Sequence, residues 1–175
     1  FLLQQVNIPV IYAPKIAKDL IDKKLDERGI NYKNILVIDK DLKVDFKHMN
    51  VEFVNTTHSI PDSFAVVIHT PNGTIFETGD FKFDLTPIGP MADLHKMAKV
   101  GSEGVKLLLS DSTNALSPGF SKSENSVDEA LSDIVNGYNG LIIIATFASN
   151  IYRVKHIVET CRKNNRKIIV FGRSM

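Results

Sequence analysis

The chain has few of the features that mark disulfide-stabilised or membrane-spanning proteins. Its one cysteine, Cys161, cannot form an internal disulfide, so a reducing intracellular compartment is the simplest interpretation. No apolar run reaches the roughly 18 residues that a bilayer-spanning helix needs. The opening segment also lacks the basic start of a signal peptide. We therefore expect a cytoplasmic protein with no membrane partner.

The chain also lacks a large excess of charge of either sign. Its 21 lysines and arginines nearly balance 20 acidic residues, so the net charge of +1 neither indicates nor excludes an RNA partner. Hydrophobic residues make up 43% of the 175 positions, which is typical of a folded domain or parts of two. The chain starts in apolar sequence and stops just after a strand pattern. We therefore expect an interior piece of a longer protein.

The first half of the chain alternates between one helical pattern and several short strand patterns. Pro14 suits the start of a helix, and apolar residues then recur at helical spacing up to Gly29. A short apolar run precedes this helix at residues 8–13, and further strands are predicted at 35–38, 42–46 and 51–55, spaced as in a β-meander. Residues 64–70 and 74–78 flank Pro-Asn-Gly, which predicts an antiparallel hairpin.

The second half alternates more regularly between helices and strands. A helix at 92–100 and a strand at 105–109 precede a loop rich in Ser, Asn, Pro and Gly, which is the best candidate for a domain boundary near residue 120. Helices at 127–135 and 151–163 then alternate with strands at 141–147 and 167–171. This alternation predicts parallel strands joined by crossover helices, and hence an α/β fold.

Three residues at strand ends are candidates for chemistry. His58 and Asp80 lie on opposite sides of the predicted hairpin, so adjacent strand ends could bring them together. An imidazole and a carboxylate suit zinc or manganese. A histidine in a loop and an aspartate in a turn fit the same pattern. Asp111 also follows an apolar strand, and by itself it is typical of a helix cap or loop residue. For Asp84 we predict a hydrogen bond to loop backbone.

Taken together, four segments carry a specific resemblance that covers essentially the whole chain. The sequences THSIPDSFAVVIHTPNG (57–73), TGDFKFDLTPIG (78–89), LLSDSTNA (108–115) and IIIATFASNIYRVKH (142–156) are similar to bacterial ribonuclease J, in the same order and at the same spacing. That family belongs to the β-CASP branch of metallo-β-lactamase hydrolases. The resemblance implies part of an αββα metallo-β-lactamase sandwich in residues 1–120 and the start of a parallel β-CASP α/β domain in residues 121–175.

The resemblance also implies roles for the three candidate residues. His58 matches a metal-binding histidine of the family, and Asp80 matches the carboxylate that bridges two zinc ions. Asp111 matches an acidic residue that orients a histidine, so Asp80 and Asp111 are the implied catalytic residues. The family's His-x-His-x-Asp-His motif would precede Phe1, and its remaining histidines would follow Met175. None of these is present in this sequence, so we expect the fragment alone to be inactive and to bind metal weakly.

The implied activity is metal-dependent hydrolysis of RNA, from the 5′ end or inside the chain, in RNA maturation and decay. Two Zn²⁺ ions, or Mn²⁺ or Mg²⁺, would polarise the phosphate and activate water. The implied partners are RNA, further copies or a paralogue in an oligomer, and other RNA-degrading enzymes. The alternative is a non-catalytic RNA-binding or assembly module with an incomplete metal site. A thioesterase-like hydrolase is disfavoured because such enzymes lack a β-CASP insertion.

Candidate RNA contacts lie in the second half of the chain. Ser149 and Asn150 precede the predicted helix at 151–163, whose exposed N–H groups would suit a phosphate. Arg173, after the last strand, is a third candidate. An ordinary helix cap with a solvated basic face fits the same residues at 149–150.

Overall fold

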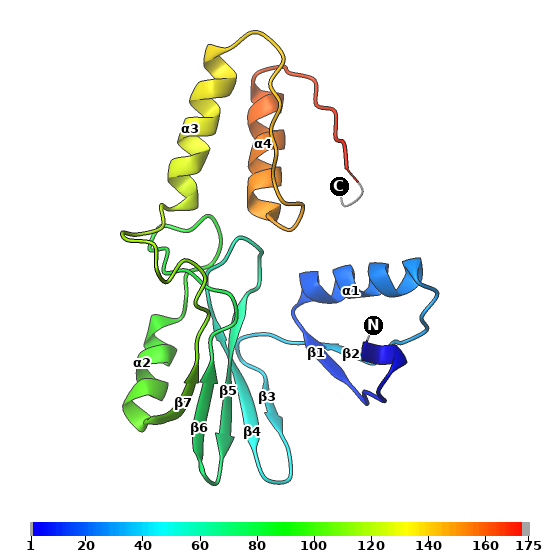
Figure 1. Cartoon of the computed structure of the whole chain (residues 1–175), viewed down its shortest axis with the longest axis vertical. Coiled ribbons are helices and arrows are strands. Elements are labelled where there is room, and N and C mark those ends of the chain that lie inside the picture. The colour runs from blue at the N-terminus through cyan, green and yellow to red at the C-terminus, as the bar shows by residue number, and fades with distance from the viewer. Residues whose placement is uncertain (1, 173–175) are drawn as a thin grey trace.

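The computed structural model describes residues 2–172, except for the side chain of residue 128, and confirms an α/β fold. Figure 1 shows two lobes, one built on β-sheets and one formed by a pair of long helices. We call residues 11–109 the sheet lobe and residues 124–172 the helical lobe. A link without regular structure joins them, and the predicted boundary near residue 120 falls within it.

The sheet lobe begins with a small β–α–β unit. A 3₁₀ turn, η1 (Leu2–Gln4), precedes β1 (Ile11–Ala13), α1 (Lys15–Glu27) and β2 (Ile35–Val37). The helix starts after Pro14 and ends shortly before Gly29, as predicted. β2 pairs with β1 in parallel, so its predicted place in the β-meander is wrong. The reason is that the apolar face of α1 packs on both strands. Leu25 of α1 forms a common buried core with Ala13 of β1 and Ile35 of β2.

The main sheet has five strands in sequence order. They are β3 (Lys43–Asp45), β4 (Asn50–Asn55), β5 (Phe64–Thr70), β6 (Gly73–Glu77) and β7 (Val105–Leu109). The first four are antiparallel, and β5 and β6 form the predicted hairpin. β7 returns parallel to β6 with one irregularity, because Thr74 pairs with Val105 whereas Ile75 pairs with Leu107.

Other elements lie on both faces of this sheet, although β7 is exposed along its whole length. On one face, α2 (Leu94–Glu103) places Val100 against a buried cluster of strand residues: Val54, Ala65, Val67 and Phe76. On the other face, Phe53 lines a depression together with Tyr12, Pro14 and Ile38 of the β1–α1–β2 unit. The order of layers is therefore the one expected for part of an αββα sandwich.

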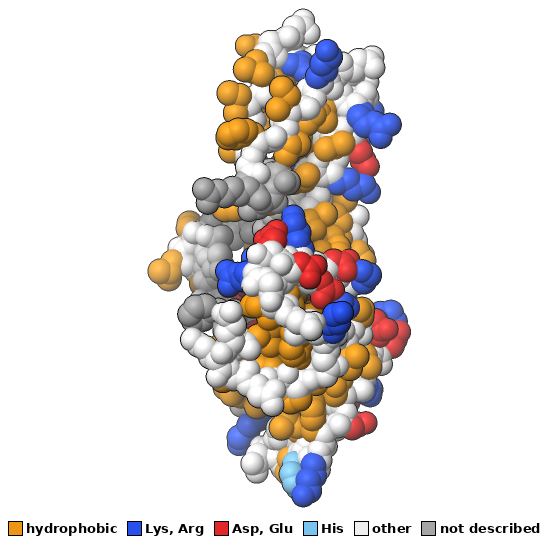
Figure 2. All heavy atoms as spheres, turned by 90° about the vertical axis from the view of Figure 1, so that its right-hand side faces the viewer, with side chains coloured by type: hydrophobic (Ala, Val, Ile, Leu, Met, Phe, Trp, Pro, Cys, Tyr) orange, Lys and Arg blue, Asp and Glu red, His pale blue; other side chains and the backbone are white. Residues whose placement is uncertain are grey.

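The helical lobe consists of α3 (Glu124–Gly137) and α4 (Ile151–Lys163), which lie side by side in Figure 1. The prediction of parallel strands at 141–147 and 167–171 is wrong for the described residues, which are extended there but join no sheet. A strand needs a neighbour for its N–H and C=O groups, and neither segment has one here. Their apolar side chains contribute to the hydrophobic surface in the upper part of Figure 2. None of the helices within residues 2–172 is both long enough and apolar enough to span a bilayer.

Candidate metal centre

The structure brings His58 and Asp80 together at one end of the main sheet. His58 follows β4, and Asp80 follows β6, and a bridge between Thr57 and Lys82 holds the two following loops side by side. The Nε2 atom of His58 lies 3.9 Å from Oδ2 of Asp80. The His58 ring is 32% exposed and the Asp80 side chain 79% exposed, so a ligand can reach both from solvent.

Asp80 faces outward because of the residue before it. Gly79 has a φ of +59°, which is unfavourable for residues with a side chain. A Cβ atom at this position would also lie 3.1 Å from the carbonyl oxygen of Phe64. The chain therefore turns sharply at Gly79, and this turn directs the Asp80 carboxylate away from the core.

Asp111 lies next to this turn. Its backbone N–H donates to Oγ1 of Thr78 over 2.9 Å, which ties the end of β7 to the end of β6. Its carboxylate accepts hydrogen bonds from the backbone N–H and the hydroxyl of Thr113, and also interacts with the N–H of Phe81. These bonds, chiefly those from Thr113, and the nearby His58 lower the pKa of Asp111. Asp111 therefore orders a loop and caps no helix among the described residues.

The site supplies some, but not all, of the ligands that a divalent cation needs. The imidazole of His58 and the carboxylate of Asp80 both line an open depression of about 350 Å³, and Asp80 also borders a second one of about 410 Å³ with Asp111. Within residues 2–172, no group of three or more His, Cys, Asp or Glu side chains could hold a metal ion. His58 and Asp80 are thus compatible with two positions of a metal site that needs further donors.

Comparison with known proteins shows a consistent similarity. The profile of the ribonuclease J β-CASP domain matches residues 139–175. Ribonuclease J 1 of Streptococcus pyogenes serotype M3 is 52% identical over the whole chain, and ribonuclease J of Mycoplasma pneumoniae is 42% identical over the same span. The chain is thus similar to ribonuclease J along its whole length. It spans 31% of the length of each of these two relatives.

A solved structure also shares the fold of this chain. It is a protein of unknown function from Enterococcus faecalis V583, which superposes with a TM-score of 0.65 over 86% of this chain and 39% of its own. The two sequences are 16% identical, so this likeness concerns the fold alone.

The three candidate RNA contacts predicted from the sequence differ in their surroundings. Asn150 is the N-cap of α4, where its side-chain oxygen accepts the N–H of Arg153 over 3.2 Å, and the residue is only 9% exposed. That is the helix-cap alternative left open by the sequence. Ser149 is exposed beside it. Arg173 lies outside the described residues.

One group of residues near the site was missed by sequence reasoning. Lys82, Asp84, Glu124 and Arg153 form a chain of ion pairs between the two lobes. The loop hydrogen bond predicted for Asp84 is confirmed, because its Oδ1 accepts the backbone N–H of Thr86 over 3.0 Å. For the ion pairs of Glu124, the only sequence signal was the preceding residue, Ser123, which is typical of helix N-caps.

The two carboxylates of this chain of ion pairs are held in their charged form. Burial disfavours ionisation of Asp84, but hydrogen bonds from Thr86, Ser123 and Glu124 and the charge of Lys82 outweigh it, so the pKa of Asp84 is lowered. Burial likewise opposes ionisation of Glu124, and hydrogen bonds and charges from Arg153 and Lys82 lower its pKa overall. Both groups therefore carry their negative charge at neutral pH.

Proposed function

We propose that the intact gene product is a metal-dependent ribonuclease that hydrolyses RNA phosphodiester bonds, from the 5′ end, internally or both, in RNA maturation and decay. The observation that carries the proposal is the approach of His58 and Asp80 to 3.9 Å at an accessible sheet end. The family supports RNA as the substrate, since curated relatives are ribonucleases J.

In this proposal, His58 and Asp80 hold divalent cations together with donors from elsewhere in the intact protein. Zn²⁺ fits an imidazole and carboxylate set best, and Mn²⁺ or Mg²⁺ would accept the carboxylate. Bound cations would supply Lewis acidity toward a phosphate oxygen. The exposed Asp80 carboxylate contributes negative charge to the site, while Asp111 and Thr78 fix the loops on either side of it.

RNA would lie across both lobes. Ser149 is the best candidate contact in the helical lobe, because it is exposed directly before the N-terminus of α4. Asn150 would contribute mainly by capping the helix that presents Ser149. We further propose a cytoplasmic enzyme that assembles with its own copies or a paralogue and works beside other RNA-degrading enzymes.

The test is replacement of Asp80 by Asn in the intact gene product, with cleavage of an end-labelled RNA as the measurement. Loss of a metal ligand should lower the cleavage rate about 100-fold or more, since several kcal/mol of transition-state stabilisation depend on the cations. An excess of chelator should have a similar effect on the wild type. The matched control is Asp45→Asn, on the exposed surface of β3, which should cleave normally.

Two outcomes would contradict the proposal. Normal cleavage by the Asp80 variant in chelator would exclude metal-dependent chemistry at this site. Tight RNA binding by the wild type without any cleavage would instead support the non-catalytic RNA-binding module.

A further inference from the structure

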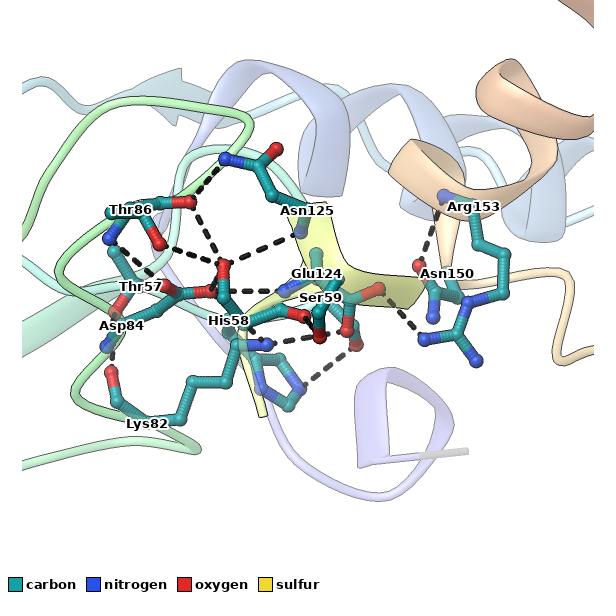
Figure 3. Close-up of polar contacts among 12 residues, drawn as sticks. Thr57, His58, Ser59, Lys82, Asp84, Thr86, Glu124, Asn125, Asn150 and Arg153 are labelled. Carbon is teal, nitrogen blue, oxygen red and sulfur yellow. Dashed lines mark hydrogen bonds and ion pairs between the residues drawn. The ribbon is translucent and has the colours of Figure 1, made fainter. Parts of the chain in front are cut away.

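The two lobes are joined by a row of alternating charges close to His58 (Figure 3). Lys82 Nζ lies 3.4 Å from Oδ2 of Asp84 and 3.2 Å from Oε1 of Glu124. Glu124 in turn holds Nη2 of Arg153 at 2.7 Å through its other oxygen. We call these four residues the interlobe ion-pair network. The Asp84 side chain is 3% exposed and that of Glu124 13% exposed, so solvent screens these pairs only weakly.

The network fixes the start of α3. Oδ2 of Asp84 accepts hydrogen bonds from the hydroxyl of Ser123 over 3.1 Å and from the backbone N–H of Glu124 over 3.2 Å. The side-chain amide of Asn125 donates to the carbonyl of Thr86 over 2.7 Å. A negative charge at a helix N-terminus is favourable, since the first N–H groups of a helix have no partner within it. The loop that follows Asp80 therefore serves as the cap of the first helix in the other lobe.

The network also reaches α4. Glu124 binds Arg153, whose backbone N–H is held by the cap residue Asn150. Next to Arg153, the Tyr152 hydroxyl packs directly on Gly89, where a Cβ atom would collide with it, so no larger residue fits at Gly89 without rearrangement. Both helix starts thus rest on one loop, residues 80–89, whose first residue is the candidate metal ligand.

We propose that Glu124 is a positioning residue that fixes the N-termini of α3 and α4 relative to the site formed by His58 and Asp80. It is suited to this role because its two carboxylate oxygens bind cations from different lobes, Lys82 and Arg153. Removal of its charge leaves both cations without their shared partner in a poorly solvated place, so the starts of α3 and α4 are held less firmly to the loop at 80–89. The catalytic consequence of this inference rests on the proposed function: RNA spans both lobes, whereas a small phosphodiester needs only the metal site.

The experiment compares Glu124→Gln with wild type in the intact gene product on two substrates, a single-stranded RNA and bis-p-nitrophenyl phosphate. Misplacing the helical lobe should lower kcat/KM for RNA by about tenfold to a hundredfold and leave hydrolysis of the small diester unchanged. The matched control is Glu129→Gln, on the exposed side of α3, which should resemble wild type on both substrates. An equal fall on both substrates, or no change on either, would overturn the proposal.

Hydrogen–deuterium exchange of the same variants gives a readout that does not depend on catalysis. Glu124→Gln should speed exchange at the first turns of α3 and α4, while β4, β5 and β6 exchange as in wild type. Unchanged exchange at both helix starts would overturn the positioning role. If the wild type cleaves neither substrate, the proposed function fails, and this exchange measurement alone decides on the role of Glu124.

Discussion

The two lobes have similar proportions of apolar segments but bury them to very different extents. In the sheet lobe, the side chains of Val54, Ala65 and Val67 are fully buried between the strands and α2. In the helical lobe, the apolar segment at 141–147 leaves Ile143 87% exposed and Phe147 84% exposed. An apolar run therefore becomes a buried strand only where another strand and a covering helix are present to pack against it.

A pair of phenylalanines provides the largest expected contrast between the lobes. Phe76→Ala on β6 should lower the free energy of unfolding by about 3–5 kcal/mol, because it leaves a cavity in the packed core under α2. The same change at the exposed Phe147 should alter it by less than about 0.5 kcal/mol. Urea denaturation followed by circular dichroism measures both values. Equal losses at the two sites would show that the lobes are packed alike.

Acid should lower the stability of the sheet lobe through Glu52, whose side chain is 13% exposed. Glu52 receives hydrogen bonds from His69 on β5 and Lys96 on α2, and Lys43 on β3 lies nearby. Burial opposes its ionisation, but His69, Lys96 and Lys43 outweigh burial and lower the pKa of Glu52. Its contribution to stability is therefore complete above the ordinary glutamate pKa, about 4.3, and is lost as the pH falls through the lower folded value.

Glu52→Gln removes this contribution. The variant should lose about 1–3 kcal/mol at neutral pH and should show a smaller further loss than wild type on acidification to about pH 3. Glu103→Gln, on the exposed end of α2, serves as control and should follow wild type. Thermal melts at both pH values give the comparison, and parallel acid losses in wild type and Glu52→Gln would contradict the assignment.

The smallest expected effect is at the surface of α1. Lys15 and Asp19 form an ion pair one helical turn apart, with side chains 63% and 55% exposed. Asp19→Asn should lower stability by only about 0.3–0.5 kcal/mol, because solvent and salt screen such pairs. The difference from wild type should disappear in about 1 M salt. A loss as large as that at Glu52 would mean that α1 contributes more to the sheet lobe than its packing indicates.

Local structure could be predicted from the sequence because its causes are local. The bounds of α4 match the predicted range at 151–163, and the hairpin around Pro71 and Asn72 has the predicted position. The approach of His58 and Asp80 could also be predicted, since both residues follow strands that one hairpin brings together. Their role in metal binding stays a prediction.

Features that depend on distant partners were missed. The ladder between β1 and β2 joins segments separated by a whole helix, and spacing alone does not reveal it. Asp84 and Glu124 are 40 residues apart, and nothing in the Asp-Leu-Thr sequence indicates that its acid caps α3. The strand prediction at 141–147 failed for the opposite reason: the apolar pattern was correct, but the described residues contain no adjacent strand to pair with it.

The irregularity between β6 and β7 has a consequence for how this protein can evolve. Lys106 is an extra residue in the ladder, and side chains alternate between sheet faces along a strand. Because Ile75, Phe76 and Glu77 pair with Leu107, Leu108 and Leu109, deletion of Lys106 would leave a regular ladder and keep the backbone N–H of Asp111 on Thr78. This strand should therefore absorb the loss of one residue, whereas the loss of a second would shift its register and turn the side chains that follow to the other face of the sheet.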